Sequence, residues 1–124
     1  MPEYMNDQIR TLAPHPLWNH FADLNAMPRP SKKEQRVIAF MKAFGESLNL
    51  ATSVDEAGNV LIKKPAMKGM EGRQAVVLQS HLDMVTQKNA DTSFDFDKQG
   101  IEMYVDGDWV RAKGTTLGAD NGIG

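Results

Sequence analysis

The 124-residue chain is predicted to be an α/β protein, with two N-terminal helices followed by a mixed sheet. Apolar residues recur at helical spacing in its first third, and after Leu50 the period shortens to that of strands. Ala75–Leu78 is a continuous apolar run, typical of a strand buried on both faces. We therefore expect a sheet layer covered by helices, with a further helix beginning near the end of the chain.

The helices are predicted from their apolar faces. The first should end before Pro28 and Pro30, because proline lacks the N–H that a helix interior requires. The second should begin with a capping box, since Ser31 precedes Glu34 by three residues. We assign both apolar faces to the core: Leu17, Trp18, Phe21 and Leu24 in the first helix, and Val37, Ile38, Met41, Phe44 and Leu48 in the second.

Two short strand pairs are predicted from their turns. Val54 and Val60–Ile62 flank a turn that contains glycine, and residues 65–72 form a loop. A polar surface loop is expected over residues 89–100. Beyond it, Asp106-Gly107 is a hairpin turn signal between the strand segments 103–105 and 108–110.

The composition excludes several functional classes. Sixteen acidic and fourteen basic residues give a net charge of −2, and no basic stripe suggests a nucleic-acid partner. Without cysteine the chain can form neither disulfides nor thiolate zinc sites, so a metal must use His and carboxylate ligands. Residues 1–7 lack the pattern of a signal peptide, and no apolar run is long enough to cross a membrane. We expect a cytoplasmic protein without a membrane partner.

The first chemical candidate is the pair His81 and Asp83, at the end of the apolar run. In an extended segment side chains two residues apart point to the same side, so the two should lie together. A carboxylate beside a metal-bound histidine can fix its tautomer and orientation. A pair of hydrogen-bonded neighbours without a metal is the simpler alternative.

The second candidate is Asp120, which lies between Gly118 and Gly122. Glycine lets the backbone turn tightly and approach a ligand closely, and a carboxylate held there could bridge two cations. Three alternatives remain open: the glycines are turn residues, they cradle a phosphate, or Asp120 and Asn121 cap a helix.

Together these segments resemble a known family. The stretches are Val76-Val-Leu-Gln-Ser-His-Leu-Asp-Met-Val-Thr-Gln-Lys-Asn89 and Gly114-Thr-Thr-Leu-Gly-Ala-Asp-Asn-Gly-Ile-Gly124. They are similar to the aminoacyl-histidine dipeptidases (Xaa-His dipeptidase, peptidase D) of the M20 zinc metallopeptidases. The likeness extends from about Pro16 to the end of the chain and includes Asn59–Ile62 and Asp108-Trp109. His-x-Asp is shared widely among M20 relatives, whereas Gly-Ala-Asp-Asn-Gly indicates the dipeptidase branch.

The resemblance implies a fold, a cofactor and a reaction. The fold would be a three-layer α/β/α catalytic domain of the phosphorylase/hydrolase-like type. His81 would bind one zinc ion, Asp120 would bridge two, and Asp83 would be the catalytic-site carboxylate that orients His81. Mn²⁺ or Co²⁺ could replace Zn²⁺. The substrates would be unblocked dipeptides, notably those that end in histidine, hydrolysed by a water that the two metal ions activate.

The resemblance also implies groups further along the chain: a Glu-Glu pair, a later Asp and a C-terminal His. Residues 1–124 are therefore expected to be an incomplete N-terminal portion of the catalytic domain, without a second domain. Lacking the general-base glutamate, this portion alone should be inactive. Its expected partners are a dipeptide substrate and either the remainder of the catalytic domain or further copies of itself.

Two other functions remain open. The chain could be a non-catalytic binding or assembly module that retains the motifs as relics. Alternatively, the segment from Asp95 to Asp106 partly matches the calcium loop of an EF-hand, with Asp95, Asp97 and Gly100 at the first, third and sixth positions. Its flanks are predicted as a loop and a hairpin, where an EF-hand has helices.

Overall fold

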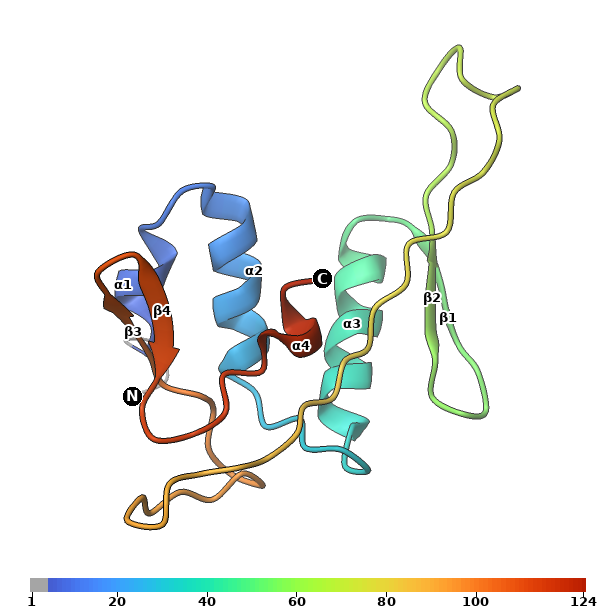
Figure 1. The fold of residues 1–124 in the computed structure, drawn as a ribbon. Coiled ribbons are helices and arrows are strands. Elements are labelled where there is room, and N and C mark those ends of the chain that lie inside the picture. Colours follow the sequence, from blue (N-terminus) through green and yellow to red (C-terminus); the bar gives the residue numbers. More distant parts are fainter. Residues whose placement is uncertain (1–4) are drawn as a thin grey trace. The chain divides into compact units, whose positions relative to one another are not determined.

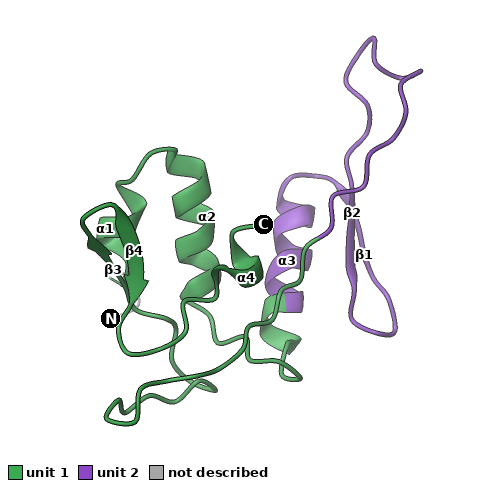
Figure 2. Cartoon of the chain, in the orientation of Figure 1, with its two compact units in different colours: residues 1–37, 80–124 green, residues 38–79 purple. Residues whose placement is uncertain are grey.

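The computed structural model describes residues 5–124 (Figure 1). Residues 1–4, which begin the stretch considered above for a signal peptide, lie outside that range. The helices are α1 (Asp7–Arg10), α2 (His15–Asn25), α3 (Gln35–Ser47) and α4 (Ala119–Gly122), and the strands are β1 (Ala51–Val54), β2 (Val60–Lys63), β3 (Met103–Asp106) and β4 (Trp109–Ala112). Figure 2 divides the chain into unit 1, residues 1–37 and 80–124, and unit 2, residues 38–79.

The two predicted helices correspond to α2 and α3. Helix α2 ends at Asn25, before Pro28, and it buries Phe21 and Leu24. Leu17, predicted to be core, remains 40% exposed near the start of this helix. The short helix α1 was not predicted, because four residues are too few to display a helical period.

The predicted capping box is wrong. Helix α3 begins at Gln35, and the Glu34 carboxylate accepts a hydrogen bond of 2.6 Å from the backbone N–H of Lys32. The Ser31 hydroxyl instead donates to Asp83 Oδ2 over 2.5 Å. Ser31 is therefore used in a long-range contact, which a local sequence pattern does not reveal. Leu48, assigned to the apolar face of this helix, lies after its end and is 52% exposed.

In unit 2, strands β1 and β2 form the predicted antiparallel hairpin. Val54 pairs with Val60, and the five residues between them form the turn. The Asp55 carboxylate organises that turn: Oδ1 accepts from the backbone N–H groups of Ala57 and Asn59, and Oδ2 accepts from the Asn59 side chain. These bonds hold the pKa of Asp55 below its usual value, with the Asn59 side chain as the largest cause.

The prediction of a buried strand at Ala75–Leu78 does not hold in the described chain. The segment is extended in Figure 1 but is not assigned as a strand, and Val76, Val77 and Leu78 are 80%, 86% and 93% exposed. A strand requires a hydrogen-bonded neighbour and apolar cover. Within residues 5–124, the sheets are β1–β2 and β3–β4, and neither includes this segment.

In unit 1, strands β3 and β4 form the second hairpin, one residue out of the predicted position. Asp106 pairs with Trp109, so the connecting residues are Gly107 and Asp108 rather than Asp106-Gly107. Gly107 has a φ of +60°, a conformation that glycine adopts without steric cost. Figure 1 shows this hairpin beside α1, with which β3 is in contact.

The core of unit 1 joins residues that are far apart in sequence. Its buried apolar members are Ile9, Phe21, Ala22, Met84, Ile101 and Met103. Among residues 5–124, the buried polar side chains are those of Asn6, Asn25 and Arg29. Among the residues that the structure describes, no helix combines the length and apolar character needed to span a membrane.

The Asp55 turn should depend on pH. A carboxyl group whose folded-state pKa is depressed stabilises the structure above its unfolded-state pKa, about 3.9, and that stabilisation is lost as the pH falls through the folded-state pKa. We therefore expect protection of the Asn59 amide from hydrogen exchange to fall below about pH 4. Asp55→Ala should weaken that protection at neutral pH, whereas Glu56→Gln, a change at the exposed neighbouring acid, should not. An Asn59 amide equally protected in Asp55→Ala would contradict this account.

The exposed apolar segment should promote self-association of the 124-residue chain. Leu78→Lys should reduce the fraction of oligomer, because a charge in this exposed, extended apolar segment opposes pairing between chains. Sedimentation velocity over a range of protein concentrations would measure it. Met67→Lys is the matched control, since Met67 is 66% exposed in a loop. A wild-type chain that stays monomeric throughout that range would show the prediction to be wrong.

Candidate metal-ligand site

The two motif segments run side by side in opposite directions. The Thr116 N–H donates to the carbonyl of Gln87 over 2.9 Å, and the Thr116 hydroxyl donates to the carbonyl of Val85 over 2.7 Å. Further along, the Ser80 hydroxyl donates to the carbonyl of Asn121 over 3.1 Å. This antiparallel arrangement brings the residues near position 81 to those near position 120.

His81, Asp83 and Asp120 meet where these segments converge. The Nε2 atom of His81 lies 2.9 Å from Asp120 Oδ1, across 39 residues of sequence. Its Nδ1 atom lies 3.2 Å from Asp83 Oδ1 and 3.1 Å from the backbone oxygen of Asp83. The side chains of His81 and Asp83 therefore lie on the same side, as their spacing predicts. Asp120 is open to solvent, with 96% of its side chain exposed.

The carboxylates at this cluster and the imidazole of His81 stabilise one another's charged forms. Both ring nitrogens of His81 face oxygen acceptors, and the hydrogen bond with Asp120 is the largest cause of the raised pKa of His81. The Ser31 hydroxyl is the largest cause of the lowered pKa of Asp83, and the positive charge on His81 lowers it further. Without a metal ion, the cluster favours a protonated imidazole between two carboxylates.

The donor atoms suit zinc, but they are few. An imidazole nitrogen and a carboxylate oxygen are ligands that zinc binds commonly, and the second carboxylate lies against the other ring nitrogen, where it can orient the ring. A catalytic zinc usually has three protein ligands. Within residues 5–124, no group of three or more His, Asp or Glu side chains is arranged to hold a metal ion. His81 and Asp120 therefore fit part of a metal site.

A buried arginine links the two motif segments. Arg29 is 1% exposed. Its Nη1 donates to the carbonyl of Leu82 over 3.0 Å, and its Nη2 donates to the carbonyl of Gly118 over 2.9 Å. Leu82 lies between His81 and Asp83, and Gly118 lies two residues before Asp120. The guanidinium thus contacts the backbone of both segments beside the candidate ligands.

Asn25 completes this buried polar cluster. Its Oδ1 accepts from Arg29 Nη2 over 2.7 Å, and its Nδ2 donates to the carbonyl of Leu117 over 2.9 Å. Burial lowers the pKa of Arg29 to about 10, so the guanidinium remains charged at neutral pH. Its Nε–H has no hydrogen-bond partner in the described structure, which costs about 1–3 kcal/mol for a buried polar group. The three hydrogen bonds that Nη1 and Nη2 donate must offset that cost.

Close packing against Arg29 requires glycine at two positions of the second motif. A Cβ added at Gly118 would lie 2.5 Å from Arg29 Nη2, and Gly118 also has a φ of +77°. A Cβ at Gly122 would lie 2.9 Å from the same nitrogen and 3.1 Å from Phe21 Cε2. Gly118 therefore has a backbone conformation that favours glycine, and both glycines make room for the guanidinium.

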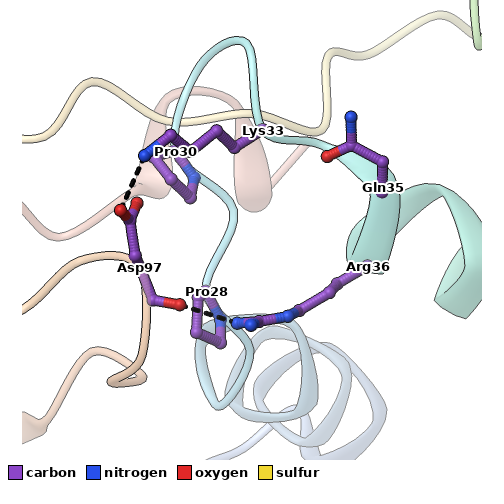
Figure 3. Close-up of a pocket in the computed structure, with 6 residues that line it drawn as sticks. All are labelled: Pro28, Pro30, Lys33, Gln35, Arg36 and Asp97. Atoms are coloured by element: carbon purple, nitrogen blue, oxygen red, sulfur yellow. Dashed lines mark hydrogen bonds and ion pairs between the residues drawn. The ribbon is translucent and has the colours of Figure 1, made fainter.

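The cavity drawn in Figure 3 is a different feature. It has a volume of about 300 Å³ and is lined by Pro28, Pro30, Lys33, Gln35, Arg36 and Asp97, which do not include the candidate ligands. Its two basic side chains both contact Asp97. Lys33 Nζ lies 2.6 Å from Asp97 Oδ2, and Arg36 Nη1 donates to the backbone carbonyl of Asp97.

The structure does not support a calcium loop at residues 95–106. The segment leads into strand β3 instead of a helix. Asp95 Oδ1 accepts from the backbone N–H of Asp97, and the Asp106 carboxylate pairs with Arg111 over 2.7 Å. These carboxylates are engaged locally and do not converge on a common point. Asp120 and Asn121 likewise do not cap α4, whose N-cap residue is Gly118 without a side-chain cap.

Comparison with known proteins tests the resemblance. The chain is 50% identical over 117 residues to the cytosol non-specific dipeptidase of Escherichia coli (strain K12), a match that covers 94% of this chain and 24% of that protein. It superposes with a TM-score of 0.91 and 49% identity on the crystal structure of aminoacylhistidine dipeptidase from Vibrio alginolyticus. The resemblance to the aminoacylhistidine dipeptidases is confirmed. No family model matches the chain.

The structural match covers 99% of this chain and 25% of the aminoacylhistidine dipeptidase. It confirms the predicted α/β fold class, and the chain fits the N-terminal portion of such a dipeptidase. The chain spans about a quarter of the length of the dipeptidases that it matches.

The sequence did not single out Arg29 or Asn25, and it assigned Ser31 to a helix cap rather than to its contact with Asp83. Charged residues are rarely buried, and nothing in the Pro-Arg-Pro sequence around Arg29 marks it as an exception. The available signals were weak: Asn25 lies four residues before Arg29, and glycines at 118 and 122 imply a close neighbour. Identifying that neighbour requires the tertiary structure.

Gly122→Ala should destabilise unit 1 by about 1–3 kcal/mol, because the new methyl group overpacks the space between Arg29 and Phe21. Urea unfolding followed by circular dichroism would measure the change. Gly72→Ala is the matched control, since a Cβ there meets no atom within 4 Å. Equal unfolding midpoints for the two variants would contradict the packing argument.

Proposed function

We propose that this chain is part of a metal-dependent dipeptidase, with His81 and Asp120 as metal ligands and Asp83 as the residue that orients His81. The observation that carries the proposal is the 2.9 Å approach of His81 Nε2 to Asp120 Oδ1. Both residues lie in the motifs on which the resemblance rests, and 39 residues separate them in sequence. Their convergence is what a shared metal site requires.

The substrate class follows from the relatives. The names of both matched proteins describe dipeptidases, one of them non-specific and the other acting on aminoacylhistidine. We propose unblocked dipeptides, including those with a C-terminal histidine, as substrates of the whole protein. A cytoplasmic location is part of the proposal, and the name of the Escherichia coli relative supports it.

The proposed cofactor is two zinc ions, as the family resemblance implies, with Mn²⁺ or Co²⁺ as replacements. When bound, such ions lower the pKa of a coordinated water and polarise the scissile carbonyl. The chain's own residues then have distinct tasks. His81 presents Nε2 towards Asp120, and Asp83 contacts the other ring nitrogen, Nδ1. The Ser31 hydroxyl in turn donates a hydrogen bond to the Asp83 carboxylate.

Residues 1–124 alone should not hydrolyse dipeptides. Two candidate ligands are too few for a catalytic zinc, and the Asp83 carboxylate is engaged with His81 and Ser31, so further ligands and a general base are required. These groups would come from the rest of the longer protein. The competing function is a non-catalytic module with relic motifs, which predicts no metal binding at His81 and Asp120.

Zinc binding separates the two functions. We expect calorimetric titration of the 124-residue chain to detect zinc binding that His81→Ala and Asp120→Ala both abolish, since each removes a ligand. The matched controls are His15→Ala and Asp108→Ala, which change an exposed histidine and an exposed turn aspartate. Binding that survives in either ligand variant would contradict the assignment.

Catalysis should be tested in the full-length protein. Asp83→Asn should lower kcat/KM for a dipeptide by about 10–100-fold, because it weakens the orientation of His81 without removing a ligand. The assay would compare a histidine-containing dipeptide with dialanine. A full-length protein that hydrolyses neither dipeptide would refute the proposed activity.

A further inference from the structure

We propose that Arg29 is a positioning residue that sets the separation of His81 and Asp120 by holding the two motif segments against one guanidinium. The inference rests on the proposed function for its purpose, but the geometry behind it is independent of any metal ion. Arg29 contacts neither His81 nor Asp120 through a hydrogen bond; it acts on the backbone beside them.

The position of Arg29 along the paired segments supports this role. The segments are hydrogen-bonded to each other at Thr116 on one side of the cluster and at Ser80 with Asn121 on the other. Between those points, Nη1 and Nη2 of Arg29 bridge the carbonyls of Leu82 and Gly118. The planar guanidinium fixes the distance between its two donors, so it also fixes the distance between the two carbonyls.

The backbone of Arg29 reinforces the same alignment. Its carbonyl accepts from the N–H of Met84 over 3.0 Å, and Pro30 forms a parallel bridge with Met84. Ser31, which follows Pro30, donates a hydrogen bond from its hydroxyl to the Asp83 carboxylate. Residues 29–31 therefore hold the His81–Met84 segment from one side, while the side chain of Arg29 reaches across to the other motif.

The lack of a carboxylate partner argues against a role in stability alone. No ion pair within residues 5–124 includes Arg29, although the negative charge of Asp83 acts on it at longer range. A buried cation that is paired only with carbonyl and amide oxygens is costly to remove from water. What an apolar side chain cannot reproduce is the bridge between two carbonyls.

The test compares Arg29→Met with Arg29→Lys and Asn6→Ala. Asn6 is buried in unit 1 and bonds to Ile101 and Met103, so Asn6→Ala disturbs the core without touching either motif. The first readout is the ¹⁵N spectrum of the imidazoles in the metal-free chain, which reports the hydrogen bond between His81 and Asp120. The second is the Kd for Zn²⁺, measured at a temperature where each variant is folded.

We expect Arg29→Met to shift the His81 resonances towards those of Asp120→Asn and to weaken zinc binding by about tenfold or more. Arg29→Lys keeps a hydrogen-bond donor at this position. Its changes in the His81 resonances and in the Kd for Zn²⁺ should therefore be smaller than those of Arg29→Met. Asn6→Ala should lower the unfolding midpoint yet leave the His81 resonances and the Kd as in the wild type. If Arg29→Met does not fold, Arg29→Lys carries the test, with a smaller change in the same direction.

The outcomes separate the positioning role from the proposed function. Unchanged His81 resonances in Arg29→Met, or losses in Asn6→Ala as large as those in the Arg29 variants, would overturn the positioning role. A wild-type chain that binds no zinc but shows the expected His81 shift in Arg29→Met would refute the metal site and retain the positioning role.

Discussion

The buried charge of Arg29 is the constraint on which unit 1 depends. A guanidinium removed from water must find acceptors for its N–H groups, and here the acceptors come from α2, from the His81–Met84 segment and from the loop before α4. Those three segments can satisfy one cation only if they meet at one place. The apolar side chains of the core then fill the space around them. Packing alone would hold these segments together less specifically, because apolar contacts have no direction.

The same constraint accounts for features that otherwise look unrelated. Gly118 and Gly122 lack side chains where the guanidinium lies, and Asn25 is buried because its amide serves both Arg29 and the carbonyl of Leu117. Asn6 has a similar task further along the core, where it accepts from Met103 and donates to Ile101. Asn25 Nδ2 also lies 3.2 Å from Met103 Sδ, so this buried amide connects strand β3 to the segment that bears Asp120.

Local patterns predicted the parts of this structure that local forces determine. The apolar face of α2, the β1–β2 hairpin and the common side of His81 and Asp83 follow from periodicity and turn chemistry. The motifs also identified His81 and Asp120 as candidates that should act together. Ser31 was misjudged because its partner lies 52 residues away, and Arg29 was missed because burial of a charge depends on acceptors elsewhere in the chain. Ala75–Leu78 has the composition of a buried strand, but composition does not supply the neighbouring strands that would bury it.

The long reach of Arg29 also bears on how the protein is made. During synthesis, this residue leaves the ribosome well before Leu82 and Gly118, which follow it by 53 and 89 residues. Until Gly118 emerges, the guanidinium lacks one of its carbonyl acceptors. It is then more stable in water than buried in the core. At about 5–20 residues added per second, that interval lasts several seconds. Asn25, at the end of α2, and Arg29 must therefore stay hydrated in the nascent chain. The buried polar cluster forms late, once the Gly118 carbonyl is available.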